Sequence, residues 1–159
     1  MELHIYRENV TDTIVKDHTK QKILYFIESK TRLFSGPLKE VYLPSKSNRH
    51  LATISYEGMF CPENVIKIHP REESINLLRT IGLRGYKFRF QGRKFWWQGH
   101  GERELVDSET KEVIARFEKT TLAWKKKGVL RIKESRLHLQ DIILLTFITV
   151  LYRMEEQSG

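Results

Sequence analysis

Basic and aromatic residues alternate along the stretch from Tyr86 to Trp97, and such a pattern could bind phosphate. If Gln91-Gly92 forms a two-residue turn, the stretch becomes a hairpin with two different faces. One face is expected to carry the core pairs: Phe90 opposite Arg93, Phe88 opposite Phe95, and Tyr86 opposite Trp97. The other face is expected to carry Lys87, Arg89, Lys94 and Trp96, with Arg89 directly opposite Lys94.

Like charges placed opposite each other on a sheet destabilise it unless an anion lies near them. A phosphate would supply that anion, and Trp96 is predicted to wedge into a lipid headgroup layer beside it. Two alternatives stay open. Either Glu102 or Glu104 on the adjoining strand neutralises the basic residues, or a different turn length breaks the pattern.

A second basic cluster, Lys125, Lys126 and Lys127, follows Trp124 and is predicted to lie in a loop before a strand at Val129. Lysines near an anionic leaflet contribute about 1 kcal/mol each, so three add attraction without sufficing alone. The alternatives are a solvated loop, a nuclear import signal or a nucleic-acid contact.

Residues arranged for catalysis are scarce in this sequence. It contains no P-loop, nucleophile elbow, paired-histidine zinc motif or acidic metal-binding loop. Gly99-His100-Gly101 is interpreted as a hairpin connection, and Cys61 as a buried thiol. Asp141 is predicted to cap a helix, where its carboxylate meets the positive end of the helix dipole. We therefore expect a protein that is not an enzyme and has no cofactor and no metal site.

The length of 159 residues, with 40% hydrophobic and 30% charged residues, predicts one globular domain spanning residues 1–159. The net charge of +8 favours anionic partners, although basic residues could also serve only solubility. The single cysteine excludes an intramolecular disulfide and fits a reducing compartment. The first residues lack the features of a signal peptide. We expect a cytoplasmic protein, with peripheral membrane and nuclear locations as alternatives.

Short apolar or alternating runs bounded by turn residues predict strands along most of the chain. The segment Glu72–Ile81 is ambiguous, because Ile75, Leu78 and Ile81 also fit a short helix. The other predicted strands lie around residues 3–5 and 14–15, and at 22–28, 40–43, 50–56, 65–68, 86–90, 93–98, 103–106, 113–117 and 129–133.

A helix is predicted over residues 139–154, and it is apolar on every side. Its uncharged run from Ile142 to Tyr152 spans about 16 Å, whereas a membrane span needs about 20 apolar residues. We interpret it as a buried core helix rather than a membrane span. Thr146 and Thr149 are expected to bond carbonyls one turn back. The fold class is therefore mainly β, an antiparallel barrel that closes around a C-terminal hydrophobic helix.

Three stretches carry a resemblance to a known group: Tyr86–Trp97, Glu104-Leu105-Val106-Asp107 with Glu112–Phe117, and Leu139–Thr146. Together they resemble the tubby C-terminal-like superfamily, which includes tubby, the phospholipid scramblases and the LURP-one-related proteins, and most of all its small uncharacterised fungal members. The resemblance implies a barrel around a C-terminal helix, phosphoinositide binding through exterior basic residues, and a membrane-linked function. It also raises a cation site near Asp141, but Ca²⁺ needs about six or more oxygen ligands, which Asp141 and Gln140 do not supply.

No motif of that superfamily's binding residues matches this chain, so the ligand-contacting residues are assigned from charge alone. We predict a non-enzymatic module for anionic membrane lipids, with phosphoinositides expected, that contacts phosphate through Lys87, Arg89 and Lys94. A protein-interaction scaffold is the first alternative. Nucleic-acid binding is the second, because basic strands with exposed aromatic residues can stack single-stranded bases.

Overall fold

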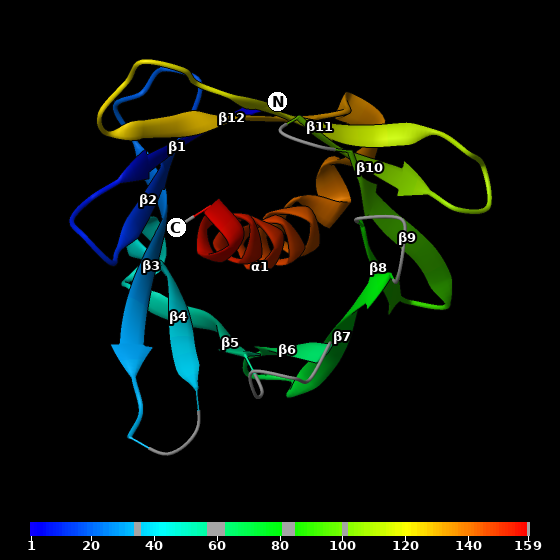
Figure 1. Cartoon of the computed structure of the whole chain (residues 1–159), viewed down its shortest axis with the longest axis horizontal. Coiled ribbons are helices and arrows are strands. Elements are labelled where there is room, and N and C mark those ends of the chain that lie inside the picture. The colour runs from blue at the N-terminus through cyan, green and yellow to red at the C-terminus, as the bar shows by residue number, and fades with distance from the viewer. Residues whose placement is uncertain (34–35, 57–62, 81–84, 100–101, 159) are drawn as a thin grey trace.

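Within the described residues, 1–33, 36–56, 63–80, 85–99 and 102–158, twelve strands follow one another in a computed structural model (Figure 1). Their bounds are β1 Glu2–Arg7, β2 Thr13–Lys16, β3 Ile23–Thr31, β4 Pro37–Leu43, β5 Arg49–Tyr56, β6 Glu63–Ile68, β7 Glu73–Thr80, β8 Gly85–Phe90, β9 Arg93–Gln98, β10 Arg103–Asp107, β11 Val113–Lys119 and β12 Lys126–Ile132. A short helix η1 (Pro44–Lys46) follows β4, and η2 (Glu134–Leu139) leads into the long helix α1 (Gln140–Ser158).

Each strand pairs antiparallel with its neighbours in sequence, and β1 pairs with β12 to close the barrel. An eight-stranded barrel is just filled by its own side chains, and the diameter grows with the number of strands. A barrel of twelve strands therefore needs further filling. Helix α1 supplies it by running through the centre of the ring (Figure 1). This confirms the predicted fold class.

The helix α1 is buried on all sides, as its apolar circumference predicts. From Ile142 to Leu151 no side chain exceeds 8% exposure. Thr146 and Thr149 donate to the carbonyl oxygens of Ile142 and Leu145, at 2.9 and 3.0 Å. The segment Glu134–Gln157 is long and apolar enough to cross a membrane, but most of its apolar window is buried inside the protein, as in the core helix of a soluble domain.

Both ends of α1 are fixed to the barrel wall by polar contacts. At its start, Asp141 accepts a hydrogen bond from the Tyr25 hydroxyl of β3, and Gln140 donates to the same hydroxyl at 2.8 Å. Near its other end, the Arg153 guanidinium donates twice to the Asn64 side-chain oxygen, at 3.0 and 2.8 Å. These contacts set the position of the helix along the barrel axis.

The ambiguous segment is a strand and not the alternative helix: in β7, Ile75 and Leu77 alternate into the core while Leu78 faces outward. Two predicted elements differ from the structure. The helix α1 continues to Ser158, four residues past the predicted end. Strand β12 begins at Lys126, since Tyr6 of β1 pairs with Lys126 across the closing seam. The predicted loop over Lys125–Lys127 is therefore wrong for Lys126 and Lys127. Cys61 and His100 lie outside the described residues.

Candidate functional site: a basic groove outside strands β7 to β9

The β8–β9 hairpin has the predicted two-residue turn and register. Gln91 and Gly92 both adopt a left-handed backbone, with φ of 48° and 75°, as a type I′ turn requires. Arg89 lies opposite Lys94, and the three predicted core-facing pairs also match. Because local turn chemistry fixes the register, each hairpin residue faces the side of the sheet that its position in the alternation predicts.

The inner face of this hairpin belongs to the core. Phe88 and Phe95 stack at 5.2 Å between ring centroids, and both are buried. Trp97 is fully buried, and its indole Nε1–H donates to the Thr146 hydroxyl of α1 at 2.9 Å. Tyr86 is buried beside them. The aromatic pairs thus anchor the hairpin to the central helix and hold its outer face rigid.

The outer face of the hairpin borders a groove of about 630 Å³. The neighbouring strand β7 adds Ser74 and Asn76 to one side, and the β10–β11 turn adds Ser108 and Lys111 to the other. The backbone N–H of Ser108 donates to the Lys94 carbonyl oxygen at 3.0 Å and holds that turn against β9. The described lining contains no acidic residue; it consists of Ser74, Asn76, Leu78, Lys87, Phe88, Arg89, Lys94, Phe95, Trp96, Ser108 and Lys111.

The alternative in which an acidic neighbour neutralises the groove does not match the ion pairs. Glu104 pairs with Arg116 at 2.6 Å, away from the hairpin cations. Among the described residues, no ion pair includes Lys87, Arg89, Lys94 or Lys111. Asp107 and Glu109, at the end of β10 and in the β10–β11 turn, pair instead with Arg93. Four cationic side chains therefore border one groove in which the described residues place no carboxylate.

The ring of Trp96, the predicted wedge, packs against two neighbours in the folded protein. Its indole lies against Gly85, where an added Cβ would come within 2.2 Å of the indole Nε1. The Lys87 ammonium sits over the indole ring, 5.3 Å from the ring centroid. A half-buried ring held between a glycine and a lysine forms a wall of the groove. Trp96 is thus a groove residue in the folded protein, and its contact with a headgroup layer stays a prediction.

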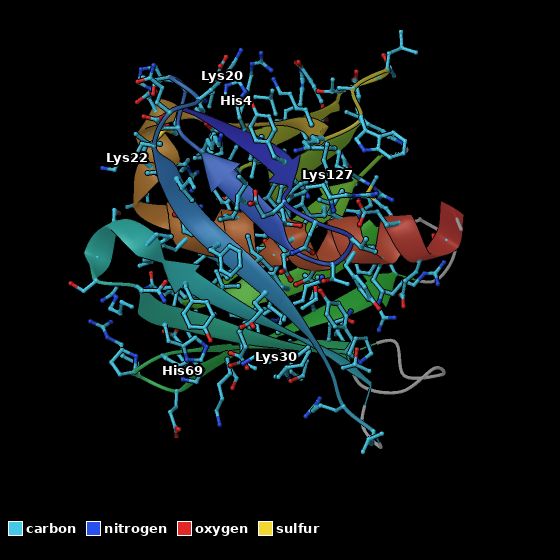
Figure 2. All side chains as sticks on the ribbon, turned by 90° about the vertical axis from the view of Figure 1, so that its left-hand side faces the viewer. His4, Lys20, Lys22, Lys30, His69 and Lys127 are labelled. Atoms are coloured by element: carbon cyan, nitrogen blue, oxygen red, sulfur yellow. The ribbon has the colours of Figure 1, made fainter. Side chains whose placement is uncertain are left out.

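The second predicted cluster does not join the groove, and its three lysines are divided. Lys127 pairs with Glu155 of α1 at 2.8 Å and lies close to the C-terminal part of that helix (Figure 2). Lys126 lies over the Tyr6 ring, 6.0 Å from its centroid, and burial lowers the pKa of its ammonium, with Lys20 adding to the effect. Of the three, only Lys125 lies in a loop and is exposed. These lysines border a separate cavity of about 360 Å³ beside α1.

Sequence reasoning missed the groove residues that the hairpin does not supply: Ser74, Asn76, Ser108 and Lys111. A signal for them was present. In a meander, β7 lies beside β8, and Ser74 and Asn76 are the polar residues of its alternating pattern. Ser108 and Lys111 belong to the predicted turn after β10. The sequence pattern alone does not show which residues outside the hairpin border its outer face, because that depends on tertiary packing.

One cluster of histidine and acidic side chains forms on the wall of β4 and β5. His50 stacks on His69 at 4.4 Å, His50 bonds Glu40, and the Thr53 hydroxyl contacts Glu40 at 2.8 Å and His69 Nε2 at 3.0 Å. A nucleophile–histidine–acid relay needs the acid on the histidine that contacts the nucleophile. In this cluster Glu40 bonds the other histidine and Thr53 itself, so the order required for nucleophilic catalysis is broken.

The comparisons with known proteins add a family but no function. Neither curated proteins nor solved structures give a match to the chain. A family model described as a family of unknown function, DUF6593, matches residues 8–156, which span eleven complete strands and most of α1. The chain therefore belongs to the DUF6593 family.

Proposed function

We propose that this protein is a non-enzymatic module that binds the phosphate groups of anionic membrane lipids in the groove outside β7 to β9, with phosphoinositides as the preferred lipids. One observation carries the proposal: Lys87, Arg89, Lys94 and Lys111 border one groove whose described lining has no carboxylate. The resemblance to the tubby C-terminal-like superfamily points the same way and stays a prediction.

The chemistry of the groove suits a headgroup with more than one phosphate. An arginine presents a planar fork of donors that matches phosphate oxygens in pairs, and lysines act as compact point charges. Ser74, Asn76 and Ser108 add neutral donors between the cations. The volume of about 630 Å³ lies within the range of roughly 300–1,000 Å³ usual for small-molecule sites. A bound anion would also relieve the repulsion between Arg89 and Lys94, which face each other across the hairpin.

A lipid headgroup and a free inositol phosphate share this chemistry, so the test has two arms. The first arm titrates the protein with soluble inositol trisphosphate. The second measures co-sedimentation with neutral, phosphatidylserine and phosphoinositide vesicles at low and high salt. Binding is expected to weaken strongly with salt, because charges at the surface are screened within about 10 Å at 0.1 M salt. Binding in the first arm alone would assign the groove to a soluble inositol phosphate.

The test variant is Lys87→Glu/Arg89→Glu/Lys94→Glu, and its matched control is Lys22→Glu/Lys46→Glu/Arg49→Glu. Both variants reverse two lysines and one arginine that are exposed in the folded protein, so they change net charge equally. The groove variant is expected to lose binding to inositol trisphosphate and the additional affinity for phosphoinositide vesicles over phosphatidylserine vesicles, while the control keeps both. Equal loss in both variants would mean that net charge, and not the groove, drives binding. No binding of wild-type protein to any probe would refute the proposal.

The scaffold and nucleic-acid alternatives have their own readouts in the same experiment. Binding of a protein partner through apolar contacts survives high salt, unlike binding to phosphate. An oligonucleotide that competes with phosphoinositide vesicles and binds more tightly than they do would favour nucleic acid.

A further inference from the structure

The loop between β11 and β12, residues 120–125, exposes two large apolar side chains to water. Trp124 is 92% exposed and Leu122 is fully exposed. Leu122 also adopts a left-handed backbone with φ of 69°, a conformation that is uncommon and unfavourable for residues other than glycine. Neither the exposure nor the backbone conformation contributes to packing within the fold. Exposed large apolar side chains and a left-handed backbone both cost free energy in the isolated protein, and such costs are typical of residues that contact a partner.

The charged residues that flank these two side chains along the loop are all positive, although Glu155 of α1 lines the same cavity as Trp124 and is paired with Lys127. Lys119 precedes the loop, Lys125 ends it, and no acidic residue lies between them. Both lysines are exposed, and neither forms an ion pair with a described residue. The loop between β1 and β2 is a natural comparison: its Val10 is 91% exposed, but Glu8 and Asp12 flank it. Of these two loops, the β11–β12 loop is the one whose exposed apolar residues are flanked by cations without acids. Leu33, in the β3–β4 connection, is also exposed beside Arg32, so the exposed tryptophan is what distinguishes the β11–β12 loop.

The β11–β12 loop lies across the barrel from the groove. In an antiparallel meander the turns alternate between the two ends, so the β11–β12 loop and the β8–β9 turn lie at opposite ends. Figure 1 also places them on opposite sides of the ring, with the loop at the upper left and the turns after β8 and β10 at the right. A flat bilayer that receives the loop therefore does not reach the groove, and the two membrane contacts are made separately.

We propose that the β11–β12 loop inserts Leu122 and Trp124 into the interfacial layer of an anionic lipid bilayer, with Lys119 and Lys125 at the level of the lipid phosphates. Tryptophan prefers the membrane–water interface, and lysines near an anionic leaflet are attracted to it. A protein partner is the weaker fit, because stable protein interfaces cover about 800 Å² per partner, far more than two side chains on a narrow loop present. The insertion is a second membrane contact that goes beyond the proposed groove.

Trp124 itself is the reporter for this insertion. Trp97 is fully buried and Trp96 is half-buried, so a change in emission on addition of vesicles reports mainly on Trp124. We expect vesicles of phosphatidylcholine and phosphatidylserine to shift the emission to the blue, and brominated lipids to quench it. The substitution Trp124→Phe should abolish both changes. Unchanged wild-type emission on these vesicles would overturn the proposal and leave the loop to a protein partner.

Co-sedimentation with the same vesicles measures the energetic contribution of the loop. Leu122→Ser/Trp124→Ser is expected to bind at least about tenfold more weakly, because burial of each such side chain contributes about one to two factors of ten in affinity. Val10→Ser removes an equally exposed apolar side chain and is expected to bind like wild type. Wild-type binding by the Leu122→Ser/Trp124→Ser variant, or an equal loss in Val10→Ser, would refute insertion through this loop.

The two membrane proposals fail separately. If the loop inserts, the groove variant Lys87→Glu/Arg89→Glu/Lys94→Glu still shows quenching of Trp124 by brominated lipids in phosphatidylserine vesicles. If the groove binds phosphate, Leu122→Ser/Trp124→Ser still binds soluble inositol trisphosphate like wild type. Loss of Trp124 quenching in the groove variant would overturn independent insertion of the loop, whatever happens to inositol trisphosphate binding.

Discussion

The hydrogen bond between Trp97 and Thr146 joins the barrel wall to the central helix, and its contribution to stability can be measured. Both side chains are completely buried, and the indole Nε1–H donates to the threonine hydroxyl at 2.9 Å. In Thr146→Val the shape of the side chain is kept, but the indole N–H loses its acceptor in an apolar interior. A buried donor left without a partner costs about 1–3 kcal/mol. The lost donation to Ile142 adds little, since that carbonyl also accepts the backbone bond of α1.

A double-mutant cycle isolates this contact from the other effects of each substitution. Trp97→Phe removes the indole N–H, so Thr146→Val should cost close to nothing in that background. The expected coupling between the two sites is about 1–2 kcal/mol. For a domain of this length, the single variant Thr146→Val should lower Tm by about 2–4 °C per kcal/mol.

Guanidinium unfolding followed by circular dichroism gives the four free energies of unfolding, with the slope m expected to stay constant. Circular dichroism is preferred to fluorescence because one substitution removes a tryptophan. Thr146→Val losing as much stability in the Trp97→Phe background as in wild type would refute the reasoning. The hydrogen bond would then contribute nothing specific, and shape complementarity alone would hold the helix against β9.

Two further predictions concern Gly85 and Lys39. Gly85→Ala should lower the free energy of unfolding by about 1–3 kcal/mol, because the new Cβ meets the Trp97 carbonyl oxygen at 2.6 Å as well as the Trp96 ring. The control Gly92→Ala, whose new Cβ has no atom within 4 Å, should cost only about 1–2 kcal/mol, from its left-handed backbone. A smaller loss of stability at Gly85 than at Gly92 in chemical denaturation would contradict this prediction. Burial, with the charge of Lys127 adding to it, lowers the pKa of Lys39 from 10.5 to about 8. The unfolded chain therefore binds this proton more tightly than the folded protein does. The free energy of unfolding of the wild type should rise by about 3 kcal/mol between pH 8 and pH 10.5. Lys39→Met should lack this rise, and parallel unfolding free energies of the two proteins over that range would count against it.

Local patterns predicted the elements whose structure depends on neighbouring residues. The hairpin register followed from Gln91-Gly92 and a period of two, and α1 followed from an apolar run without charge. The failures involve distant partners. Lys126 and Lys127 became part of β12 because β1, more than a hundred residues earlier, pairs with them or their neighbours. The ambiguity between strand and helix at Ile75 and Leu78 is resolved by partner strands in the same way: pairing with β6 and β8 keeps the chain extended and places Leu78 outside the core.

The candidate site divides in the same way. Which hairpin cations share a face was readable from alternation, since Lys87, Arg89 and Lys94 come from one hairpin. The sequence did not show whether an acidic residue neutralises these cations, because tertiary packing decides whether the Glu104 side chain turns toward β9 or β11. In the structure Glu104 pairs with Arg116 of β11. The packing of Trp96 on Gly85 depends on the approach of two adjacent strands, which the composition of either strand does not encode.

The seam between β1 and β12 has a consequence for how the chain reaches its native state. All other strand pairs join neighbours in sequence, but this one joins residues 2–6 to residues 126–131. During synthesis, eleven strands can leave the ribosome before the seam can form, and the helix that fills the interior comes later still. Until then β1 presents an unpaired edge, and the core-facing side chains have no helix to cover them. Such species expose sites for pairing with other chains. Folding should therefore finish only after β12 and α1 have left the ribosome, with a rate limited by closure of this long loop.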